Sequence, residues 1–511
     1  MAAVTVEPTI PAQEPEVLEP VRARGPKPMS PRADRYAQMV ALAALLAGPA
    51  IMCLHAAVAN DPDIWWHLRT GEWITQHRLI PRTDVFSGPN AGKPWPAYSW
   101  LFEVLIFQIV HRLGLVGIVS YSVGMVFAIT CALYRLVNRL SGDFTGTALL
   151  VFASCFAMGH LYTPRPWLFT ILFLILEVDI LMQARRTGRL RGLLWLPLIF
   201  AVWSNIHIQF IDGLVVLGLA LIEPIAALRG IGQKTRLGVA PAAAVLGAST
   251  LATMVNPFGW HIFRVAYDLA AQPGVLDKIN ELKAIPFRDA ADWTILALTL
   301  LAVAALARVR DLRVFEVGLF AFAIFTGFRS QRDVWMIAIA ASTILAATIP
   351  ARQNQKNNRL RPMAMAVSGL VAAVLLVAGF RVMKVNDAML EREIEKTYPV
   401  HAVAAIQAGH YPGPLYNDFN WGGYLIWTLR MPVAVDGRAA FYGDEALNRS
   451  VATWNAEPDW NKDPLLQHAG IVVGPTKAAL MQVLRMDPKY RLVYEDKTAV
   501  VFVPQHAPAV Q

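Results

Sequence analysis

Charged residues and cysteines are both scarce in this chain of 511 residues. Only 16% of the residues are Asp, Glu, Lys or Arg, whereas 55% are hydrophobic, and long apolar runs recur along most of the sequence. This composition excludes a protein built around one large soluble core and predicts a membrane protein with many helical spans. The cysteines all fall inside predicted spans, so no disulfide framework or zinc site can be built from them. They are Cys53, Cys131 and Cys155.

Several common motifs are also missing. Residues 1–34 are rich in Pro, Glu and Ala but have neither the apolar core nor the cleavage site of a signal peptide. We therefore expect a disordered cytoplasmic tail followed by an uncleaved first span. No Walker loop or dinucleotide fingerprint occurs, so nucleotide binding is not expected. The formal charge is +9, yet Lys and Arg lie in short gaps between spans, so nucleic acid is not an expected partner.

Residues 35–380 offer a series of segments near the length of about 20 apolar residues that crosses a bilayer. Nearly every gap that this series places in the cytoplasm is basic, in agreement with the positive-inside rule. The sequence thus predicts a polytopic all-α membrane protein of about eleven transmembrane helices in a bacterial inner membrane, with a cytoplasmic N-terminus and a periplasmic C-terminus. The predicted spans are 36–58, 115–136, 144–161, 167–184, 192–208, 211–228, 237–255, 292–307, 314–328, 333–350 and 363–380.

The first outer loop, residues 59–114, is too polar to span a bilayer but is rich in Trp and Pro. It contains two short helical patterns, at 64–77 and 98–113. We expect both helices to lie along the membrane surface, because Trp prefers the headgroup level. If 98–113 crossed the membrane, the arginine cluster at 185–191 would lie outside, against the charge bias.

Residues 381–511 follow the last predicted span and form the longest outer segment. Helix-like and strand-like pieces alternate along it, which predicts a periplasmic α/β domain. Helical patterns lie at 400–409, 422–429 and 476–485, extended pieces lie at 413–418, 432–436 and 469–473, and a hairpin is expected at 490–503.

Two carboxylates, Asp61 and Asp63, stand at the start of the first outer loop on either side of Pro62. The proline restrains the backbone between them. Two carboxylates at this spacing can bind a divalent cation, or one can act as a general base toward an acceptor hydroxyl. An alternative is structural, because Asp63 directly precedes the helical pattern at 64–77 and could cap it.

Three arginines lie at span ends on the predicted outer face. Arg165 stands between two prolines, and Arg329 and Arg332 lie where one span ends and the next begins. Cations at the edge of the hydrocarbon are costly unless they are paired or functional. A lipid phosphate would satisfy them, since Arg matches phosphate oxygens in bidentate fashion. Snorkelling into the headgroup region is the structural alternative.

Weaker substrate-binding candidates are polar residues near the same face. Arg69 could meet a phosphate, but it could equally pair with Glu72 three residues later on one helix face. For His207, the structural alternative is a buried side chain whose hydrogen bonds are all made within the protein, and it is the one we favour. The candidates are His67, Arg69, Asn205, His207 and Gln209.

The C-terminal segment has one dense polar region. Gly422 and Gly423 follow an extended piece and could let a ligand approach the backbone at a helix start. Asp418, Asp436 and Arg438 lie at predicted strand ends, where α/β domains place binding groups. The alternative is structural, with Asp436 and the following glycine forming a turn.

These features together resemble the GT-C class of membrane glycosyltransferases, which includes the protein mannosyltransferases and the lipid A aminoarabinose transferase. The resemblance covers about residues 35–380. It rests on an acidic pair in the first outer loop, surface-lying helices before the second span, a body of many spans and a C-terminal outer domain. The runs at 63–71 and 81–87, and the tail from Trp421 to Arg438, look like bacterial members of this class.

The resemblance implies an inverting transfer of a sugar from a polyprenyl-phosphate donor to an acceptor at the outer leaflet. Asp61 or Asp63 would orient or deprotonate the acceptor, directly or through Mg²⁺ or Mn²⁺. The departing lipid phosphate would be stabilised by Arg165, Arg329 and Arg332. One departure is that the pair reads Asp-Pro-Asp instead of the Asp-Glu of the protein mannosyltransferases. The acceptor class and the metal requirement are therefore not inherited.

Two other functions are compatible with the same architecture. One is a transporter or flippase for a lipid-linked substrate, and the other is a non-catalytic membrane scaffold. Few charged residues lie in mid-span and the two halves show no repeat, which argues against a transporter. The expected partners are thus a polyprenyl-phosphate sugar donor, an unknown acceptor and membrane lipids.

Overall fold

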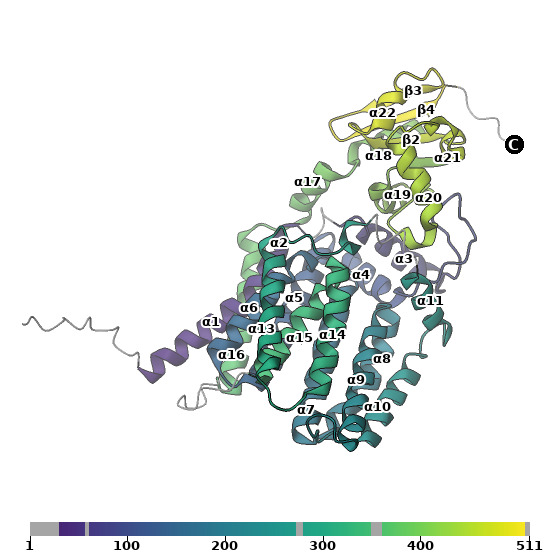
Figure 1. Cartoon of the computed structure of the whole chain (residues 1–511). Coiled ribbons are helices and arrows are strands. Elements are labelled where there is room, and N and C mark those ends of the chain that lie inside the picture. Colours follow the sequence, from purple (N-terminus) through teal and green to yellow (C-terminus); the bar gives the residue numbers. More distant parts are fainter. Residues whose placement is uncertain (1–29, 57–60, 272–278, 349–359, 506–511) are drawn as a thin grey trace, which may run out of the picture.

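The computed structural model of the chain describes residues 30–56, 61–271, 279–348 and 360–505. A bundle of helices carries the C-terminal segment at one end, as Figure 1 shows. The helices that precede this segment are α1 (Pro31–Ile51), α2 (Cys53–Ala56), α3 (Ile64–His77), α4 (Trp100–Leu113), α5 (Val116–Ser141), α6 (Phe144–Ala157), α7 (Trp167–Thr187), α8 (Trp195–Ile206), α9 (Phe210–Leu228), α10 (Val239–Ala252), α11 (His261–Ala270), α13 (Ala290–Ala307), α14 (Val314–Arg329), α15 (Val334–Thr348) and α16 (Pro362–Val382). Short 3₁₀ helices are η1 (Gly159–Leu161), η2 (Leu190–Leu194), η3 (Asn280–Leu282) and η4 (Gln331–Asp333).

Five helices of the described residues are long and apolar enough to cross a membrane, namely α5, α7, α9, α13 and α16. They fit the predicted polytopic helical membrane protein. Each other predicted span also contains a helix, but these helices are shorter or more polar. The number of eleven crossings therefore stays a prediction.

Helix α1 begins earlier than the sequence suggested. The Ser30 side chain accepts a hydrogen bond from the N–H of Ala33 at 3.2 Å, and Pro31 occupies the first helical position. Both are signals for a helix N-terminus, so residues 31–34 are helical and do not belong to a disordered tail. Residues 1–29 of the predicted tail lie outside the described residues.

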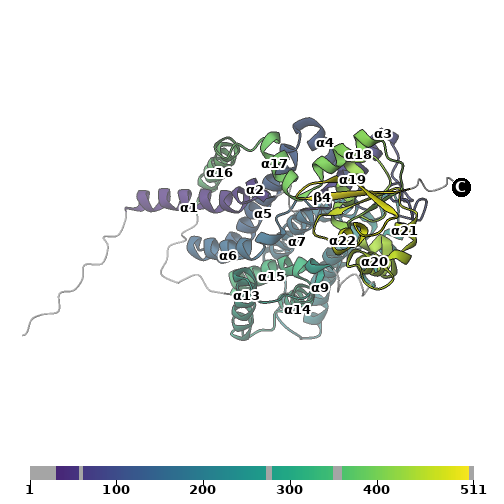
Figure 2. The same cartoon turned by 90° about the horizontal axis from the view of Figure 1, so that it is seen from above.

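The centre of the bundle is α15. Its residues from Val334 to Ala346 are all buried, and the helix packs against α5, α6, α13 and α14. Small and polar side chains join helices in membranes, and Ser342 accordingly shares a hydrogen bond of 2.5 Å with Ser154 of α6. At one edge of the bundle α16 packs against α1, as the view from above shows (Figure 2).

Some charged side chains inside the bundle form ion pairs across helices. The guanidinium of Arg185 in α7 donates to Glu223 of α9 at 2.6 Å through Nε and at 2.5 Å through Nη2. The Nη2 atom also donates to Glu316 of α14 at 2.7 Å. Pairing of this kind makes buried charges tolerable in a bilayer, and here it connects three helices.

The two helices of the first outer loop lie between the bundle and the C-terminal segment (Figure 1). The range predicted for the first is that of α3, and α4 begins two residues after the start predicted for the second. Helices α3 and α4 pack against each other. Helix α4 also contacts α5 and α8, and α3 contacts α19 of the C-terminal segment. Their orientation along a membrane surface stays a prediction.

The C-terminal segment combines helices with a small mixed sheet. Its four strands have the order β1-β2-β4-β3, in which β1 and β2 are parallel and the other pairs are antiparallel. The predicted hairpin at 490–503 is confirmed as β3 and β4. The elements are α17 (Asp387–Thr397), α18 (Val400–Gly409), β1 (Leu415–Asn417), η5 (Phe419–Trp421), α19 (Gly422–Leu429), α20 (Ala439–Trp454), η6 (Trp460–Lys462), α21 (Pro464–Gln467), β2 (Ile471–Pro475), α22 (Ala479–Leu484), β3 (Tyr490–Glu495) and β4 (Ala499–Pro504).

Alternate residues of the sheet face two different cores, as the period of two along a strand requires. Val472 and Phe502 pack with Trp454 in a core within the C-terminal segment. Ile471 and Val501 instead belong to the large core that continues into the helical bundle. One face of the sheet is therefore fixed to the rest of the molecule.

The extended piece predicted at 432–436 is not a strand of this sheet, which corrects the prediction. Val433 instead forms an isolated parallel bridge with Ser87 of the first outer loop. Its N–H donates to the Phe86 carbonyl at 3.1 Å, and its own carbonyl accepts from Gly88 at 3.0 Å. The backbone groups of this piece thus bind the loop, and α20 follows it in a stretch where no helix is predicted.

Candidate functional site

A cavity of about 430 Å³ lies where the first outer loop, the helical bundle and the C-terminal segment meet. Charged and polar side chains reach it from segments that are far apart in the sequence. They are Asp63, His67, Glu103, Arg165, His207, Glu281, Arg332 and Arg438. The cavity is also lined by aromatic side chains, among them Trp66, Trp95, Tyr98, Trp167 and Phe441.

Asp61 and Asp63 both bind Arg165. The Nε atom of the arginine donates to Asp61 Oδ2 at 2.6 Å, and its Nη1 atom donates to Asp63 Oδ2. The loop that carries Arg165 is itself fixed, because the Tyr121 hydroxyl donates to the Arg165 carbonyl at 2.9 Å. The structure thus brings together the two acids and one of the three arginines singled out in the sequence.

The two acids differ in what they can do. Asp61 is 1% exposed, and its second oxygen accepts a hydrogen bond of 2.9 Å from the backbone N–H of Asp63. Asp63 lines the cavity with one oxygen beside Gly437. It stands at the N-cap position of α3, but its side chain accepts no hydrogen bond from that helix, so the capping alternative is wrong. Asp61 acts as an anchor for the turn, and Asp63 faces the space where a ligand would lie.

A third carboxylate, Glu281 of η3, completes the charged cluster. Its Oε1 lies 3.7 Å from Nη1 of Arg165 and 4.0 Å from Nη1 of Arg332. Burial raises the pKa of Asp63 to about 7; Arg165 opposes this shift, whereas the negative charges of Asp61 and Glu281 add to it. Asp63 therefore changes charge near neutral pH.

A second polar pair, His67 and Glu103, lies on the same cavity. His67 Nδ1 is 3.3 Å from Glu103 Oε1, and the pair joins α3 to α4. Burial raises the pKa of Glu103 to about 8, against the opposing charge of Arg438, and burial lowers the pKa of His67. At neutral pH both groups are uncharged, so the contact is a hydrogen bond between a carboxylic acid and a neutral imidazole.

The C-terminal segment closes the site against the first outer loop. A Cβ at Gly437 would collide with the Asp63 carboxylate, and a Cβ at Gly423 would lie 2.9 Å from the Pro62 carbonyl oxygen. The glycines therefore allow the C-terminal segment to approach the first outer loop closely. The neighbouring Arg438 donates to Asp84 of the loop at 2.6 Å. This arrangement fixes where the acidic pair stands.

Solved structures were compared with this fold. The crystal structure of the oligosaccharyltransferase from Archaeoglobus fulgidus in the apo form matches with 10% sequence identity and a TM-score of 0.54, over 87% of this chain and 70% of that one. Two crystal structures of ArnT from Cupriavidus metallidurans, bound to undecaprenyl phosphate and in the apo state, match with 14% and 13% identity over 92% and 93% of this chain and 98% of theirs, each with a TM-score of 0.45. No protein-family model and no curated protein sequence matches.

The chain has the fold of the GT-C membrane glycosyltransferases. The resemblance stated from the sequence is confirmed at this level. At 10% identity the match concerns the fold alone, so the residues of the site and the substrates have to be argued from this chain's own geometry.

Several of the candidates from the sequence do not reach the cavity of this GT-C fold. Arg69 donates to Glu72 at 2.5 Å, which is the structural alternative given above. Asn205 accepts a hydrogen bond of 2.8 Å from Trp100 Nε1 and donates to a backbone carbonyl. Gln209 donates to Asp333 of η4 at 2.7 Å. Arg329 is exposed and lies outside the cavity lining.

The remaining candidates do line the cavity. His67 and Arg332 are described above, and His207 Nδ1 lies 2.9 Å from the Thr170 hydroxyl while its ring borders the cavity. Arg332 is 28% exposed, and its Nε is buried without a hydrogen-bond partner among the described residues. A buried donor of this kind is a natural contact for an anionic ligand.

The sequence did not point to Glu281 or Glu103 as site residues. Glu281 follows residues 272–278, which lie outside the described residues, in a segment without a clear helical or strand pattern. Glu103 lies in the helix that the sequence predicts at 98–113. Its position on α4 opposite His67 of α3 depends on how the two helices pack. The only local signal was for Glu103, which is an acidic residue in the otherwise apolar run 101–107.

A divalent cation at Asp61 and Asp63 stays a prediction. Arg165 already binds one oxygen of each carboxylate, and the second oxygen of Asp61 accepts from the Asp63 N–H. Among the described residues no group of three His, Cys, Asp or Glu side chains is placed to hold a metal. The side chains as they stand therefore do not fit a metal, which would have to displace Arg165.

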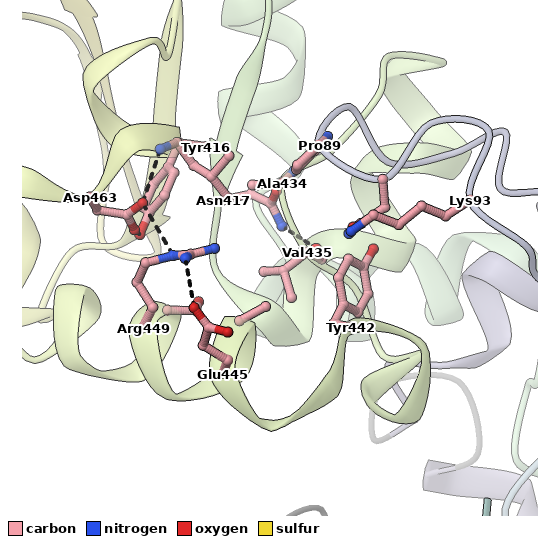
Figure 3. A pocket seen from close by; sticks show the side chains of 14 residues that line it. Pro89, Lys93, Tyr416, Asn417, Ala434, Val435, Tyr442, Glu445, Arg449 and Asp463 are labelled. Atoms are coloured by element: carbon pink, nitrogen blue, oxygen red, sulfur yellow. Dashed lines mark hydrogen bonds and ion pairs between the residues drawn. The ribbon is translucent and has the colours of Figure 1, made fainter. Parts of the chain in front are cut away.

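A smaller cavity of about 250 Å³ lies in the C-terminal segment beside the first outer loop (Figure 3). Its charged residues include Lys93, Arg449 and Asp463, and none of the candidates from the sequence lines it. Asp463 accepts hydrogen bonds from the Tyr416 hydroxyl at 2.8 Å and from Thr453 at 3.0 Å. Hydrogen bonds within the C-terminal segment already engage this carboxylate, so we assign the catalytic chemistry to the larger cavity.

Proposed function

We propose that this protein is a membrane glycosyltransferase that moves a sugar from a polyprenyl-phosphate donor to an acceptor hydroxyl at the periplasmic face. The observation that carries the proposal is the position of Asp63. Its carboxylate faces a cavity beside Arg165 and Arg332, so one space offers both a base and positive charge. The GT-C fold, shared with an archaeal oligosaccharyltransferase, supports the reaction class by analogy.

The chemistry follows from these groups. The acceptor oxygen attacks the anomeric carbon of the sugar, and its proton passes to the Asp63 carboxylate. The bond between that carbon and the phosphate oxygen breaks, and the electron pair leaves with the polyprenyl phosphate. A base with a pKa near the working pH is the most effective, and Asp63 meets this condition. One displacement of this kind inverts the configuration of the sugar.

Arg332 is the group we assign to the donor phosphate. In the described part of the chain its Nε has no hydrogen-bond partner, and its contact with Glu281 is long, at 4.0 Å, so hydrogen-bond donors remain for a ligand. Arg165 contributes charge at short range but is engaged by Asp61 and Asp63. Positive charge that is already in place where negative charge develops in the transition state lowers the activation barrier of the transfer. Arg329 lies outside the cavity, and we do not assign it to the donor.

The placement in the membrane belongs to the same proposal. The acidic loop and the C-terminal segment would both face the periplasm, and the N-terminus would lie in the cytoplasm. An odd number of crossings, eleven in the sequence-based count, meets this requirement. The polyprenyl chain of the donor would lie in the lipid beside the bundle while its phosphate reaches the cavity.

The experiment that tests the function is a mass spectrometric profile of lipid-linked sugars in four strains. They are the wild type, a deletion, Asp63→Asn and the control Asp459→Asn, whose side chain is exposed in the C-terminal segment. Asn keeps the size of Asp63 but cannot accept the proton, so we expect at least a hundredfold loss of activity. A polyprenyl-phosphate sugar should accumulate equally in the deletion and in Asp63→Asn.

Other outcomes identify other functions. Accumulation in the deletion but not in Asp63→Asn would favour a transporter of the lipid-linked substrate, since transport needs no base. An unchanged lipid pool together with a membrane defect in the deletion alone would favour a scaffold. The control strain should match the wild type in every case.

A further inference from the structure

A concave pocket of about 640 Å³ lies on α7 far from the Asp63 cavity. Helix α7 begins next to Arg165, and Asp179, which lines the pocket, is twelve residues after Trp167. At a rise of about 1.5 Å per residue these two points are roughly 18 Å apart along the helix. The pocket therefore belongs to a different part of the bundle from the proposed active site.

One carboxylate organises two arginines of this pocket. Asp179 is 2% exposed, and its Oδ2 accepts from Arg135 at 2.5 Å and from Arg139 at 2.7 Å. The arginines are four residues apart on α5, so they share one face of that helix. Their side chains remain 48% and 43% exposed. A single negative charge thus positions two guanidinium groups.

Two further arginines line the same pocket from the segment that follows α7. Arg189 precedes η2 and Arg191 lies within it, and both are exposed. The side chains that line this concave space thus include four arginines and one aspartate, with formal charges that sum to +3. All four cations are Arg and none is Lys, and the planar guanidinium is the side chain that matches phosphate oxygens in bidentate fashion.

We propose that this pocket binds the phosphate headgroup of an anionic phospholipid. Both α5 and α7 are long and apolar enough to span the membrane, so the pocket lies at the ends of two candidate spans. Ile180 and Leu190 line it beside the arginines and offer apolar contact to the glycerol and upper acyl chains. Basic pockets between membrane helices bind lipid headgroups in this way. The proposal does not depend on the catalytic function.

The test is native mass spectrometry of the full chain in detergent, titrated with phosphatidylglycerol or with phosphatidylcholine of the same acyl chains. The informative variant is Arg189→Gln with Arg191→Gln, because both side chains are exposed and their loss leaves Asp179 paired. The matched control is Arg308→Gln with Arg310→Gln, two exposed arginines at the same spacing outside the pocket. Glycerol 3-phosphate serves as a soluble competitor that carries the phosphate without the lipid.

We expect phosphatidylglycerol to bind more tightly than phosphatidylcholine. At about 1 kcal/mol per cation near a lipid headgroup, the pocket variant should bind it roughly tenfold to thirtyfold more weakly, and the control should be unchanged. Equal binding of the two lipids, or an equal loss in both variants, would overturn the proposal. Displacement of phosphatidylglycerol by glycerol 3-phosphate at matched concentration would assign the pocket to a soluble phosphate compound instead.

Discussion

At the scale of single residues, Asp63 is the group whose charge state should control the reaction. Burial places its pKa at about 7, and it must be a carboxylate to accept the acceptor's proton. The transfer rate should therefore rise as the pH rises through about 7 and level off above it. Initial rates with the donor identified by the lipid profile, measured in membranes across this pH range, check this. The residual rate of Asp63→Asn should lack this step, and a wild-type profile that is flat around pH 7 would contradict the assignment of Asp63 as base.

Glu103 should limit stability at alkaline pH. Its carboxyl stays protonated in the fold up to about pH 8, whereas in the unfolded chain it ionises near its ordinary pKa of 4.5. Its favourable contribution is complete below pH 4.5 and is lost as the pH rises through 8. Glu103→Gln keeps a neutral side chain at every pH. We expect the variant to exceed the wild type by roughly 2–4 kcal/mol above pH 8 and to match it near pH 5.

The measurement for Glu103→Gln is the apparent midpoint of thermal unfolding in detergent at both pH values. The exposed Glu445→Gln serves as the control, because its carboxylate is 97% exposed and its charge should not affect the midpoint. If Glu103→Gln is destabilised equally at both pH values, the carboxyl is ionised in the fold and the pairing with His67 is an ion pair.

At the scale of elements, Gly437 should couple the C-terminal segment to the acidic pair. It precedes α20, and any side chain there collides with the Asp63 carboxylate. Gly437→Ala should therefore push Asp63 away from Arg165 and lower activity at least tenfold, since small displacements of a catalytic group are costly. Gly88→Ala is the matched control in the same contact region, where the nearest atom would be an ordinary 3.9 Å away. Equal activity of the two variants, with normal protein levels, would refute the coupling.

Some elements of this fold were readable from the sequence because local signals define them. The bounds of α3, α18 and α19 agree with prediction, since each is an amphipathic or apolar run with a proline three or four residues beyond its end. The piece at 432–436 was read as a sheet strand because its residues favour extended backbone, but its hydrogen bonds go to Ser87 and its neighbours in the first outer loop. No local pattern shows which distant segment supplies a partner.

The residues of the site could be predicted from the sequence to a similar extent as the elements of the fold. Asp61, Asp63 and Arg165 stand out as charges beside prolines at the edge of apolar spans, and the structure brings them together. Asn205 and Gln209 have the same appearance in the sequence but make hydrogen bonds inside the protein. Polar residues at helix ends serve both purposes, and only the packing of the helices distinguishes them.

At the scale of the whole molecule, the fold separates two charged sites along α7. The Asp63 cavity lies beside the start of this helix, and the arginine pocket lies toward its end. The C-terminal sheet shares one core with the bundle, so it cannot move independently of the site. If α7 crosses the bilayer, the two sites face opposite sides of the membrane. The orientation of the chain therefore decides which substrates each site can meet.

Two variants that each carry one added cysteine test this orientation. The native cysteines provide little background, because Cys53 and Cys155 are buried and Cys131 is half-buried. Lys497→Cys lies in the turn between β3 and β4, and Arg310→Cys lies between α13 and α14, both exposed. If the C-terminus is periplasmic, an impermeant maleimide should label Lys497→Cys in intact cells and label Arg310→Cys only after the membrane is opened. Labelling of both variants in intact cells would place the two positions on one face. The number of crossings between them would then be even, and the predicted placement of the C-terminus and of the gap between α13 and α14 on opposite faces would be wrong.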